Sequence, residues 1–475
     1  MQRLAMRLAA GDRKAAYSGP PLAGDFAAAL VGVQIASLFL VVTGRPGMSA
    51  LLALSLVTLL LALNRAKERV LREPLVLADA WLLPQVWKYP EMYIPFLPVK
   101  GILAATGGVV MCLGALMWAE AGIPYVGNGA LYGIVFMVAV IPVIGLILLR
   151  RLFFSDRIAQ VLLHHLPVSH NAAADAARNG ALAAALMHPV LAGRMERNKP
   201  DFMRDAFTRP EASRWPGGFE AMLREVEEKP LDECPHVLLI QAESFCDIRE
   251  HLKGEQREAL KDFLPNWDKL KAMGRTLPTP ENAYGAYTMR TEFSKLTGLE
   301  MDELGAFAFN PYLLAARQPM WSLARFFRDK GYETVCMHPY HKGFFRRDKV
   351  MPNLGFERFL GIEELGELER FGPYVSDLAL GERILRELEA SARPVFCFAI
   401  TMEAHGPWTK GRFTEEEKNE MLILTTAKEQ HCIALQMYLW HLKHLDLLFY
   451  NLLSKKLTRS SEIWPYGDHA PYFIK

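Results

Sequence analysis

The sequence predicts a multispan α-helical membrane domain followed by an α/β domain with a mostly parallel sheet. Two observations predict this order. Long uncharged apolar segments occur in the first third of the 475-residue chain, and short apolar segments rich in β-forming residues alternate with helical segments after residue 235. Such alternation is typical of a parallel sheet covered by helices. A chain of this length is also expected to contain two or three domains.

The composition agrees with a membrane component. The chain is 51% hydrophobic and 22% charged, and its net charge of +2 is too balanced to indicate a nucleic-acid partner. The six cysteines form no C-x-x-C pair and no metal-finger spacing. We therefore expect them to pack as small apolar side chains.

Residues 1–157 are predicted to form the membrane domain, with about four spans. The basic N-terminal residues lack the cleavage site of a signal peptide. Four uncharged segments follow, each long enough to cross a bilayer. One apolar helix can instead lie in a soluble core, but four in a third of the chain favour a membrane. These segments are Phe26–Thr43, Pro46–Asn64, Gly101–Ala119 and Leu131–Leu149.

Two other parts of the N-terminal half are predicted to lie at the membrane surface. Leu75–Phe96 mixes apolar, aromatic and charged residues, which is typical of an interfacial or re-entrant segment. Residues 158–230 are predicted to be an interfacial helix and a linker. Within them, Asn179–Gly193 is either a surface helix or a weakly hydrophobic fifth span, and four prolines interrupt the charged part that follows.

Residues 231–475 are predicted to form the α/β domain. Three segments are typical of buried parallel strands, and a fourth is a poor, short strand. The strands are His236–Ala242, Glu333–Met337, Pro394–Met402 and, as the poor one, Ile463–Tyr466. Apolar residues with helical spacing predict helices between them. The helices are Leu260–Met273, Trp321–Lys330, Asp377–Ala390 and Ala427–Leu453.

Polar residues follow the predicted strands at their carboxyl ends, where functional groups of parallel sheets gather. Carboxylates and imidazoles are ligands for Zn²⁺, Mn²⁺ and related divalent ions. Taken singly, each such residue is more often a solvated, capping or merely hydrogen-bonded side chain, so the metal site is predicted from their combination. The residues are Glu243, His338, His405, Asp468 and His469.

The segment Asn282–Gly298 places a hydroxyl at the start of a predicted helix. A turn at Gly285 precedes Thr288, and apolar residues then recur with helical spacing. Unpaired N–H groups and the helix dipole favour an anion there, which suits a nucleophile that carries a phosphoryl group. Alone, Thr288 would more often be an N-cap, and the surrounding polar residues favour the nucleophile. Thr291 and Ser294 are competing hydroxyls deeper in the helix.

Five motifs together resemble the lipoteichoic acid synthase and phosphoglycerol transferase branch of the sulfatase/alkaline phosphatase superfamily. Their order and spacing also match, and an apolar N-terminal third fits the same branch. The combination is specific, whereas YGDH or HGP alone would not be. The motifs are QAESF at 241–245, YTMRTEF at 287–293, MHPYHKGFFRRD at 337–348, ITMEAHGPW at 400–408 and YGDH at 466–469.

The resemblance implies an alkaline-phosphatase-like α/β/α sandwich that binds one divalent metal ion, commonly Mn²⁺, with Zn²⁺ and Mg²⁺ as alternatives. It implies that Thr288 is the catalytic nucleophile and also a metal ligand. A threonine at this position argues against a true sulfatase, which uses a modified cysteine or serine. The positions that match the metal ligands are Glu243, Thr288, Asp468 and His469.

The resemblance also implies residues that bind the substrate phosphate, namely His338, Arg347 and His405. A guanidinium binds phosphate bidentately, which suits Arg347. Either His405 or His338 could act as general acid for the leaving group. Phe345 stands where the teichoic-acid enzymes have tryptophan. It keeps the stacking surface without the indole N–H donor, which bears on the acceptor or head group.

We therefore predict a membrane-anchored transferase. Thr288 would attack a phospholipid resembling phosphatidylglycerol, release diacylglycerol and pass the phosphoglycerol group to a glycan or glycolipid acceptor. The alternatives are a phosphoethanolamine transferase, a phosphodiesterase or sulfuric ester hydrolase, and a non-catalytic membrane homologue. The predicted partners are the lipid donor, the acceptor and the lipid bilayer, with no nucleic acid.

Charge and chemistry predict different orientations of the membrane domain. Lysine and arginine cluster before the first apolar segment, within Arg65–Arg72 and after the fourth segment. With four spans, the positive-inside rule places the α/β domain in the cytoplasm. The resemblance implies chemistry outside the bacterial cytoplasmic membrane. We expect that Asn179–Gly193 or Leu75–Phe96 also inserts, so that the domain lies on the extracytoplasmic face.

The chain stops six residues after His469. The enzymes that it resembles continue through further strands and helices. We therefore expect the sandwich to be cut short at its C-terminus, with consequences for activity.

Overall fold

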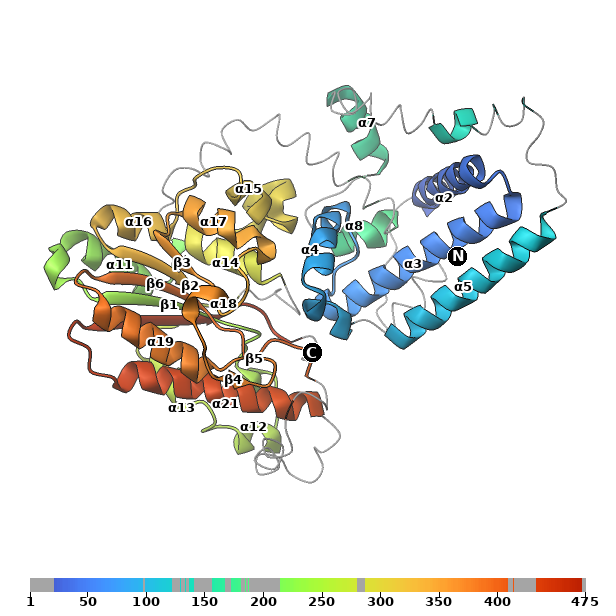
Figure 1. Cartoon of the computed structure of the whole chain (residues 1–475). Helices are drawn as coiled ribbons and strands as arrows, with labels where there is room; N and C mark the ends of the chain where they lie inside the picture. Colours follow the sequence, from blue (N-terminus) through green and yellow to red (C-terminus); the bar gives the residue numbers. More distant parts are fainter. Residues whose placement is uncertain are drawn as a thin grey trace. The chain divides into compact units, whose positions relative to one another are not determined.

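The computed structural model divides into two compact units, Met1–Pro200 and Asp201–Lys475, and each is described by itself. The division falls inside the predicted linker, and the bounds of the three predicted regions stay predictions. The chain is drawn in Figure 1. The structure describes residues 21–96, 99–121, 129, 133, 136–140, 156–166, 172–180, 184, 187, 214–279, 287–408, 413 and 433–471.

Three long helices form the main part of the first unit: α2 (Pro21–Thr43), α3 (Pro46–Leu71) and α5 (Val99–Ala119). Within the described residues, two stretches are long and apolar enough to cross a membrane, Pro46–Arg69 in α3 and Val99–Ala119 in α5. Helix α2 adds a shorter apolar stretch at 31–43. The multispan arrangement therefore stays a prediction. The predicted segment 131–149 lies mostly outside the described residues.

The connection between α3 and α5 is broken into short helices. Prolines at 84, 90 and 95 interrupt it, because proline cannot continue an α-helix through its interior. Short helices therefore take the place of one long helix in Leu75–Phe96, and the insertion of this segment into the membrane stays a prediction. Most of Asn179–Gly193 lies outside the described residues. The short helices are η1 (Leu77–Leu82), α4 (Leu83–Lys88), η2 (Pro90–Met92) and η3 (Ile94–Phe96), and the unit also contains α7 (Asp156–His165) and α8 (Ala172–Asn179).

The second unit is built on a five-stranded parallel sheet with the order β3-β2-β6-β1-β7. Strands β1 and β2 have the predicted bounds, and β6 is shorter than predicted at both ends. Strand β7 is longer than predicted and pairs with β1 over seven residues, from His236–Ser461 to Ala242–Gly467. The strands are β1 (His236–Ala242), β2 (Glu333–Met337), β3 (Arg358–Leu360), β6 (Val395–Ile400) and β7 (Ser461–Gly467).

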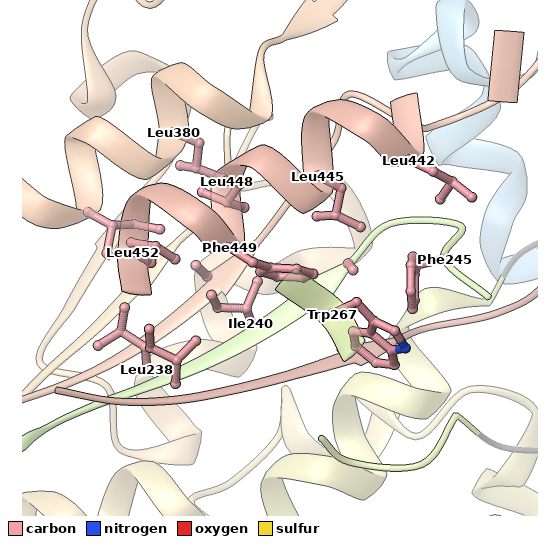
Figure 2. Packing of buried hydrophobic residues seen from close by; sticks show 14 of the residues in the cluster. Leu238, Ile240, Phe245, Trp267, Leu380, Leu442, Leu445, Leu448, Phe449 and Leu452 are labelled. Atoms are coloured by element: carbon pink, nitrogen blue, oxygen red, sulfur yellow. The ribbon is translucent and has the colours of Figure 1, made fainter. Parts of the chain in front are cut away.

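One face of this sheet is covered by α13 (Pro265–Ala272), α19 (Asp377–Ala390) and α21 (Ile433–Ser454). Leucines of α21 reach Leu238 and Ile240 of β1, as Figure 2 shows. Helices α19 and α21 approach closely at a glycine: a Cβ atom on Gly381 would lie 2.3 Å from Leu448 Cδ1. Burial of this apolar face is the main stabilising contribution to the layer.

The opposite face is covered by α14 (Thr288–Thr297), α16 (Leu323–Lys330) and α17 (Arg347–Leu354). Phe327 of α16 stacks on Phe396 of β6 with 4.4 Å between ring centroids. The sheet therefore lies between two helical layers, as Figure 1 shows. The predicted helix at 260–273 begins only at Pro265, a residue favoured at the first helical position.

The remaining elements of the second unit are short and connect the layers. The antiparallel pair β4–β5 forms a separate two-stranded sheet. These remaining elements are α11 (Gly217–Glu228), η5 (Leu231–Glu233), η6 (Ile248–Glu250), α12 (Glu255–Ala259), η7 (Met301–Phe309), α15 (Tyr312–Ala315), η8 (Phe344–Arg346), α18 (Ile362–Leu365), β4 (Arg370–Phe371) and β5 (Tyr374–Val375).

Candidate active site

The predicted site residues lie at the carboxyl ends of adjacent parallel strands. Glu243 directly follows β1, His338 directly follows β2, and Asp468 and His469 directly follow β7. His405 lies in the loop after β6. Because β2, β6, β1 and β7 are neighbours in the sheet, their ends bring these side chains to one edge.

Glu243, Asp468 and His469 form a buried cluster that could hold a metal ion. Their ligand atoms all lie within 4.8 Å of one another. His469 Nε2 is 3.3 Å from Asp468 Oδ2 and 3.6 Å from Glu243 Oε1. Asp468 Oδ2 is buried and accepts no hydrogen bond from any residue that the structure describes. A carboxylate oxygen left without a donor, beside a second carboxylate and an imidazole, fits a divalent cation.

The protonation of this cluster reflects two carboxylates that share one imidazole. Burial, then the negative charge of Glu243, raises the pKa of Asp468 to about 7. Burial alone would also raise the pKa of Glu243, but the hydrogen bond with His469 and nearby imidazoles lower it to about 2. Burial opposes a charge on His469, and the two carboxylates nevertheless raise its pKa to about 9. The cluster thus contains two carboxylates and only one imidazole that can carry a compensating positive charge.

Thr288 is the first residue of α14, and the preceding residue is strained. Tyr287 has a φ of 66°, a conformation that non-glycine residues rarely adopt and that is common near functional sites. Thr288 is therefore at the first helical position and is not the N-cap. Its hydroxyl is close enough to Asp468 to favour the ionised carboxylate. The turn at Gly285 lies outside the described residues.

The neighbouring hydroxyl, Thr291, has a structural contact. Its Oγ1 donates a hydrogen bond of 2.7 Å to the backbone oxygen of Asp468. Helix α14 is thereby tied to the cluster at two points, through Thr288 and Thr291. Since Thr291 already has this partner, the geometry favours Thr288 as the reacting hydroxyl.

The loop after β1 also bends sharply beside the cluster. Ser244 has a φ of 53°, and its N–H donates to Asp468 Oδ1 at 2.7 Å while its hydroxyl donates to Glu243 Oε1 at 2.9 Å. A Cβ atom on Gly467 would lie 2.0 Å from the Phe245 oxygen, so only glycine fits there. These contacts hold the two carboxylates next to each other.

Arg347 is fully buried and is held by a residue that the sequence analysis did not select. Its Nε and Nη2 donate to Oε1 and Oε2 of Glu292 at 3.1 and 2.7 Å. Glu292 lies on α14, one helical turn after Thr288. This bidentate pair neutralises the guanidinium and directs its Nη1 toward His338. Glu292 therefore links the nucleophile helix to the predicted phosphate-binding arginine.

His338 is held in its neutral form. Arg347 Nη1, which can only donate, lies 3.4 Å from His338 Nε2, and His338 Nδ1 lies 3.5 Å from the Ile400 oxygen. The proton is therefore on Nδ1. Burial, followed by the charge of Arg347, lowers the pKa of His338 well below its usual range. Of the two histidines left open as general acids, the geometry favours His405.

His405 is partly exposed and has a defined tautomer. Its Nδ1 lies 2.8 Å from the Gly406 oxygen and 3.2 Å from the Tyr374 hydroxyl. A carbonyl oxygen only accepts, so Nδ1 carries the hydrogen and Nε2 is the nitrogen that can exchange a proton. Phe345 is half-buried, with its ring 5.4 Å from Arg347 Cζ. It lies over the guanidinium as a stacking surface.

The residues that sequence reasoning missed are polar side chains buried behind the predicted ones. Glu292 accepts a hydrogen bond from the Tyr312 hydroxyl and one of 3.3 Å from Gln241, which in turn accepts one of 2.6 Å from Tyr466. One signal was available, because Gln241 is a polar residue close to the carboxyl end of a buried strand. Glu292 gave no such signal, because in the sequence it is simply a polar residue on a predicted helix.

Comparison with known proteins identifies the family of the second unit. A model of the sulfatase family matches residues 235–469. The chain is 28% identical over 456 residues to the capsular polysaccharide biosynthesis protein RkpI of Rhizobium meliloti, covering 91% of this chain and 75% of that protein. It is 30% identical over 239 residues to a putative cyclic β-1,2-glucan modification protein of the same organism, covering 50% of this chain and 36% of that protein.

Solved structures with a similar chain course are more distant. The lipoteichoic acid synthase LtaP of Listeria monocytogenes is 18% identical, with a TM-score of 0.40, and the match covers 52% of this chain and 61% of that one. The phosphoglycerol transferase GacH of Streptococcus pyogenes is 22% identical, with a TM-score of 0.40, and the match covers 58% and 69%.

The match to the family model agrees with the five-stranded parallel sheet between two helical layers, so the predicted alkaline-phosphatase-like fold of this unit is confirmed. The resemblance seen in the motifs is likewise confirmed. Residues 235–469 of this chain belong to the sulfatase family, whose members are enzymes.

Proposed function

We propose that this chain is a membrane-anchored, metal-dependent transferase that moves a phosphoglycerol-type head group from a phospholipid to a glycan or lipid acceptor. The observation that carries this proposal is the position of Thr288. Its hydroxyl stands at the start of α14, beside the buried cluster of Glu243, Asp468 and His469. This arrangement combines a nucleophile with an anion-stabilising helix terminus and a cation site.

The donor set fits one divalent ion, with Mn²⁺ as the first candidate. Glu243, Asp468 and His469 would hold it, together with the Thr288 hydroxyl. A bound divalent ion would lower the pKa of that hydroxyl and stabilise negative charge on a phosphoryl oxygen. Oxygen and imidazole donors suit Mn²⁺, Zn²⁺ and Mg²⁺ to different degrees, so the donor set supports a divalent ion without selecting one.

In the first half-reaction Thr288 Oγ attacks the phosphorus of the donor diester. The new Oγ–P bond forms as the bond from phosphorus to the diacylglycerol oxygen breaks. The hydroxyl proton leaves to solvent. His405 enters the step as an imidazolium and gives its Nε2 proton to the departing oxygen, which leaves the neutral ring with its hydrogen on Nδ1. Arg347, which Glu292 orients, would reach the phosphate through its Nη1, and in this structure that nitrogen lies beside His338 Nε2.

In the second half-reaction a hydroxyl of the acceptor attacks the same phosphorus. Its proton passes to His405 Nε2, the new P–O bond forms and the Thr288 Oγ–P bond breaks. Thr288 Oγ then takes a proton from solvent, which regenerates the hydroxyl. A glycan acceptor is supported by the names of two relatives, one in capsular polysaccharide biosynthesis and one in cyclic β-1,2-glucan modification. A lipid donor is supported by the two long apolar helices of the first unit.

Mass spectrometry of the full chain tests the covalent step. The chain is incubated in detergent with phosphatidylglycerol, phosphatidylethanolamine or both, with Mn²⁺ present, and its peptides are mapped. We expect a phosphoglycerol adduct on Thr288 and release of diacylglycerol. Thr288→Ala should remove both, with a loss of several orders of magnitude in rate. A phosphoethanolamine adduct would instead identify the alternative head group.

The matched control is Ser294→Ala, on the same helix. The Ser294 hydroxyl donates to the Leu299 oxygen at 2.6 Å and is not part of the cluster. This variant should keep the adduct and most of the turnover. An adduct on Thr291 or Ser294 would reassign the nucleophile. Absence of any adduct and of diacylglycerol release with every lipid would overturn the proposed function and favour a non-catalytic homologue.

A further inference from the structure

The loop after β6 carries a buried carboxylate that the mechanism above does not use. In this loop every second residue from 401 to 405 is polar, namely Thr401, Glu403 and His405. Thr401 Oγ1 accepts a hydrogen bond of 3.0 Å from the N–H of Glu243, so the start of the loop is tied to the cluster. Glu403 is fully buried, and His405 is the predicted proton donor.

Glu403 is enclosed by two histidines of α21. Its Oε1 lies 2.9 Å from His441 Nδ1 and 3.0 Å from His444 Nδ1. The two histidines are one helical turn apart and therefore share a face of the helix. Leu442 and Leu445, next to them on α21, pack into the core instead, as Figure 2 shows. The helix thus presents its polar side to the loop and anchors itself on the apolar side.

The second carboxylate oxygen of Glu403 is held from the other side. Glu403 Oε2 accepts a hydrogen bond of 2.8 Å from the N–H of Asp377, and the N–H of Glu403 donates to Asp377 Oδ1 at 3.4 Å. Burial, and then the charge of Glu403, raises the pKa of Asp377 well above its usual range. Burial opposes ionisation of Glu403, but the hydrogen bonds from His441 and His444 lower its pKa to about 2. Glu403 is therefore the charged member of the pair.

The same contacts lead back to His405. Tyr374, whose hydroxyl lies 3.2 Å from His405 Nδ1, belongs to β5, and Asp377 begins α19 two residues after that strand. Glu403 therefore fixes both the loop that carries His405 and the segment that carries its hydrogen-bond partner.

We propose that Glu403, held by His441 and His444, is a positioning residue that fixes His405 Nε2 for proton transfer in the site. A buried carboxylate is costly unless it is paired, and a plain apolar loop would stabilise the fold as well. The charged cluster instead constrains a single loop geometry, which is what an oriented proton donor requires. This inference rests on the proposed function, because that function assigns the role of His405.

A double-mutant cycle tests the inference in the full chain. Release of diacylglycerol from fluorescent phosphatidylglycerol is measured for wild type, Glu403→Gln, His405→Ala and the double variant. Glu403→Gln should lower kcat/KM by about 10- to 100-fold, as loss of partners that orient site residues does. In the His405→Ala background the same change should cost less than about threefold, because the two residues act as one unit. Independent, multiplicative losses would overturn the inference.

A second measurement does not depend on turnover. Diethyl pyrocarbonate modifies the imidazole nitrogen that carries the lone pair, and its rate at His405 is followed by peptide mass spectrometry. Glu403→Gln should change this rate by about threefold or more, because reactivity follows local order. The control is Glu382→Gln, which removes an exposed ion pair of 3.3 Å with Arg386 on α19 and should leave the rate unchanged.

The two measurements separate the inference from the proposed function. If wild type releases no diacylglycerol, the proposed function fails and the His405 labelling rate alone decides the positioning role. If Glu403→Gln keeps the wild-type labelling rate at His405, the cluster is merely structural. The same conclusion follows if wild type is active and Glu403→Gln keeps the wild-type kcat/KM. Should Glu403→Gln fail to fold, Glu403→Gln with His441→Gln removes the carboxylate and one of its imidazole partners together and takes its place in both assays.

Discussion

At the scale of single residues, the site is a problem of buried charge. Glu243 and Asp468 share one imidazole, that of His469, whereas Glu292 has Arg347 as a complete partner. Two carboxylates that share one histidine leave a buried negative charge uncompensated, and an uncompensated buried charge is strongly unfavourable. The cluster of Glu243, Asp468 and His469 can therefore accept a cation, whereas the charges of Glu292 and Arg347 already neutralise each other.

The first residue-scale prediction concerns the cation. The full chain in detergent should hold about one divalent ion after dialysis against trace Mn²⁺, as a single cluster of three ligands implies. Glu243→Ala or Asp468→Asn should remove most of it, because each takes away a charged ligand. Metal content is measured by elemental mass spectrometry. Glu250→Gln, which removes an exposed acid paired with Lys271 at 2.9 Å, is the control. Equal metal content in all four proteins would contradict the assignment.

The second residue-scale prediction concerns the Glu292–Arg347 pair. Glu292→Ala should destabilise the protein by about 3–5 kcal/mol, because it leaves Arg347 buried without a partner. Replacing both residues, as Glu292→Gln with Arg347→Met, should recover most of the stability and none of the activity. Denaturant unfolding and diacylglycerol release are the two measurements. A double variant as unstable as the single one would show that the pair is not the source of the loss.

At the scale of elements, the parallel strands separate two functions by their two ends. The carboxyl ends carry the site, and the amino ends carry contacts that only stabilise the sheet. At the amino end of β1, His236 Nδ1 accepts a hydrogen bond of 3.0 Å from the N–H of Val395 in β6. Burial, followed by the charge of Arg459, lowers the pKa of His236 to about 4. This histidine must stay neutral to accept that bond.

The element-scale prediction follows from that shift. The folded state resists protonation of His236, so its contribution to stability is complete above pH 6.5 and is lost as the pH falls toward 4. His236→Asn, which can accept the same bond without a charge, should show a flatter decline in stability across this window. Denaturant midpoints of both proteins at several pH values check this. Parallel curves would mean that His236 does not titrate in this range.

At the scale of the whole molecule, the two units differ in what they expose. In the first unit Trp87 is 91% exposed, Trp118 is 85% exposed and Met111 of α5 is 72% exposed. Large apolar side chains of this number are unusual on a surface that faces water, and tryptophan is enriched at bilayer interfaces. In the second unit the apolar side chains of the helices lie largely between the layers. These exposed side chains agree with the two candidate spans of the first unit, and its insertion into a lipid bilayer stays a prediction.

The whole-molecule prediction concerns topology. The proposed substrates require the catalytic unit on the extracytoplasmic face of the bacterial cytoplasmic membrane, and therefore an odd number of spans before it. The additional span is expected to be Asn179–Gly193 or Leu75–Phe96. An alkaline phosphatase reporter fused near residue 230 should be active, and a cytoplasmic reporter at the same point inactive. The reverse pattern would place the catalytic unit in the cytoplasm.

Much of the catalytic unit was predictable because its signals are local. A buried parallel strand is a continuous apolar run, so β1 and β2 have the predicted bounds. Strand β7 was underestimated because it lies at the edge of the described sheet, where it holds Pro465 and needs fewer apolar residues. The proximity of Glu243, Asp468 and His469 was also predictable, since residues directly after neighbouring parallel strands meet at one edge of the sheet.

What the sequence by itself determined is the order of elements, the family and the set of candidate ligands. Only the tertiary structure decided the partners behind them: Glu292 with Arg347, and Glu403 with His441 and His444. The physical reason is that a polar residue on a helix or loop gives the same local signal whether it faces water or a buried charge. Its partner lies 38 to 55 residues away, and only the packing of the layers brings the two together.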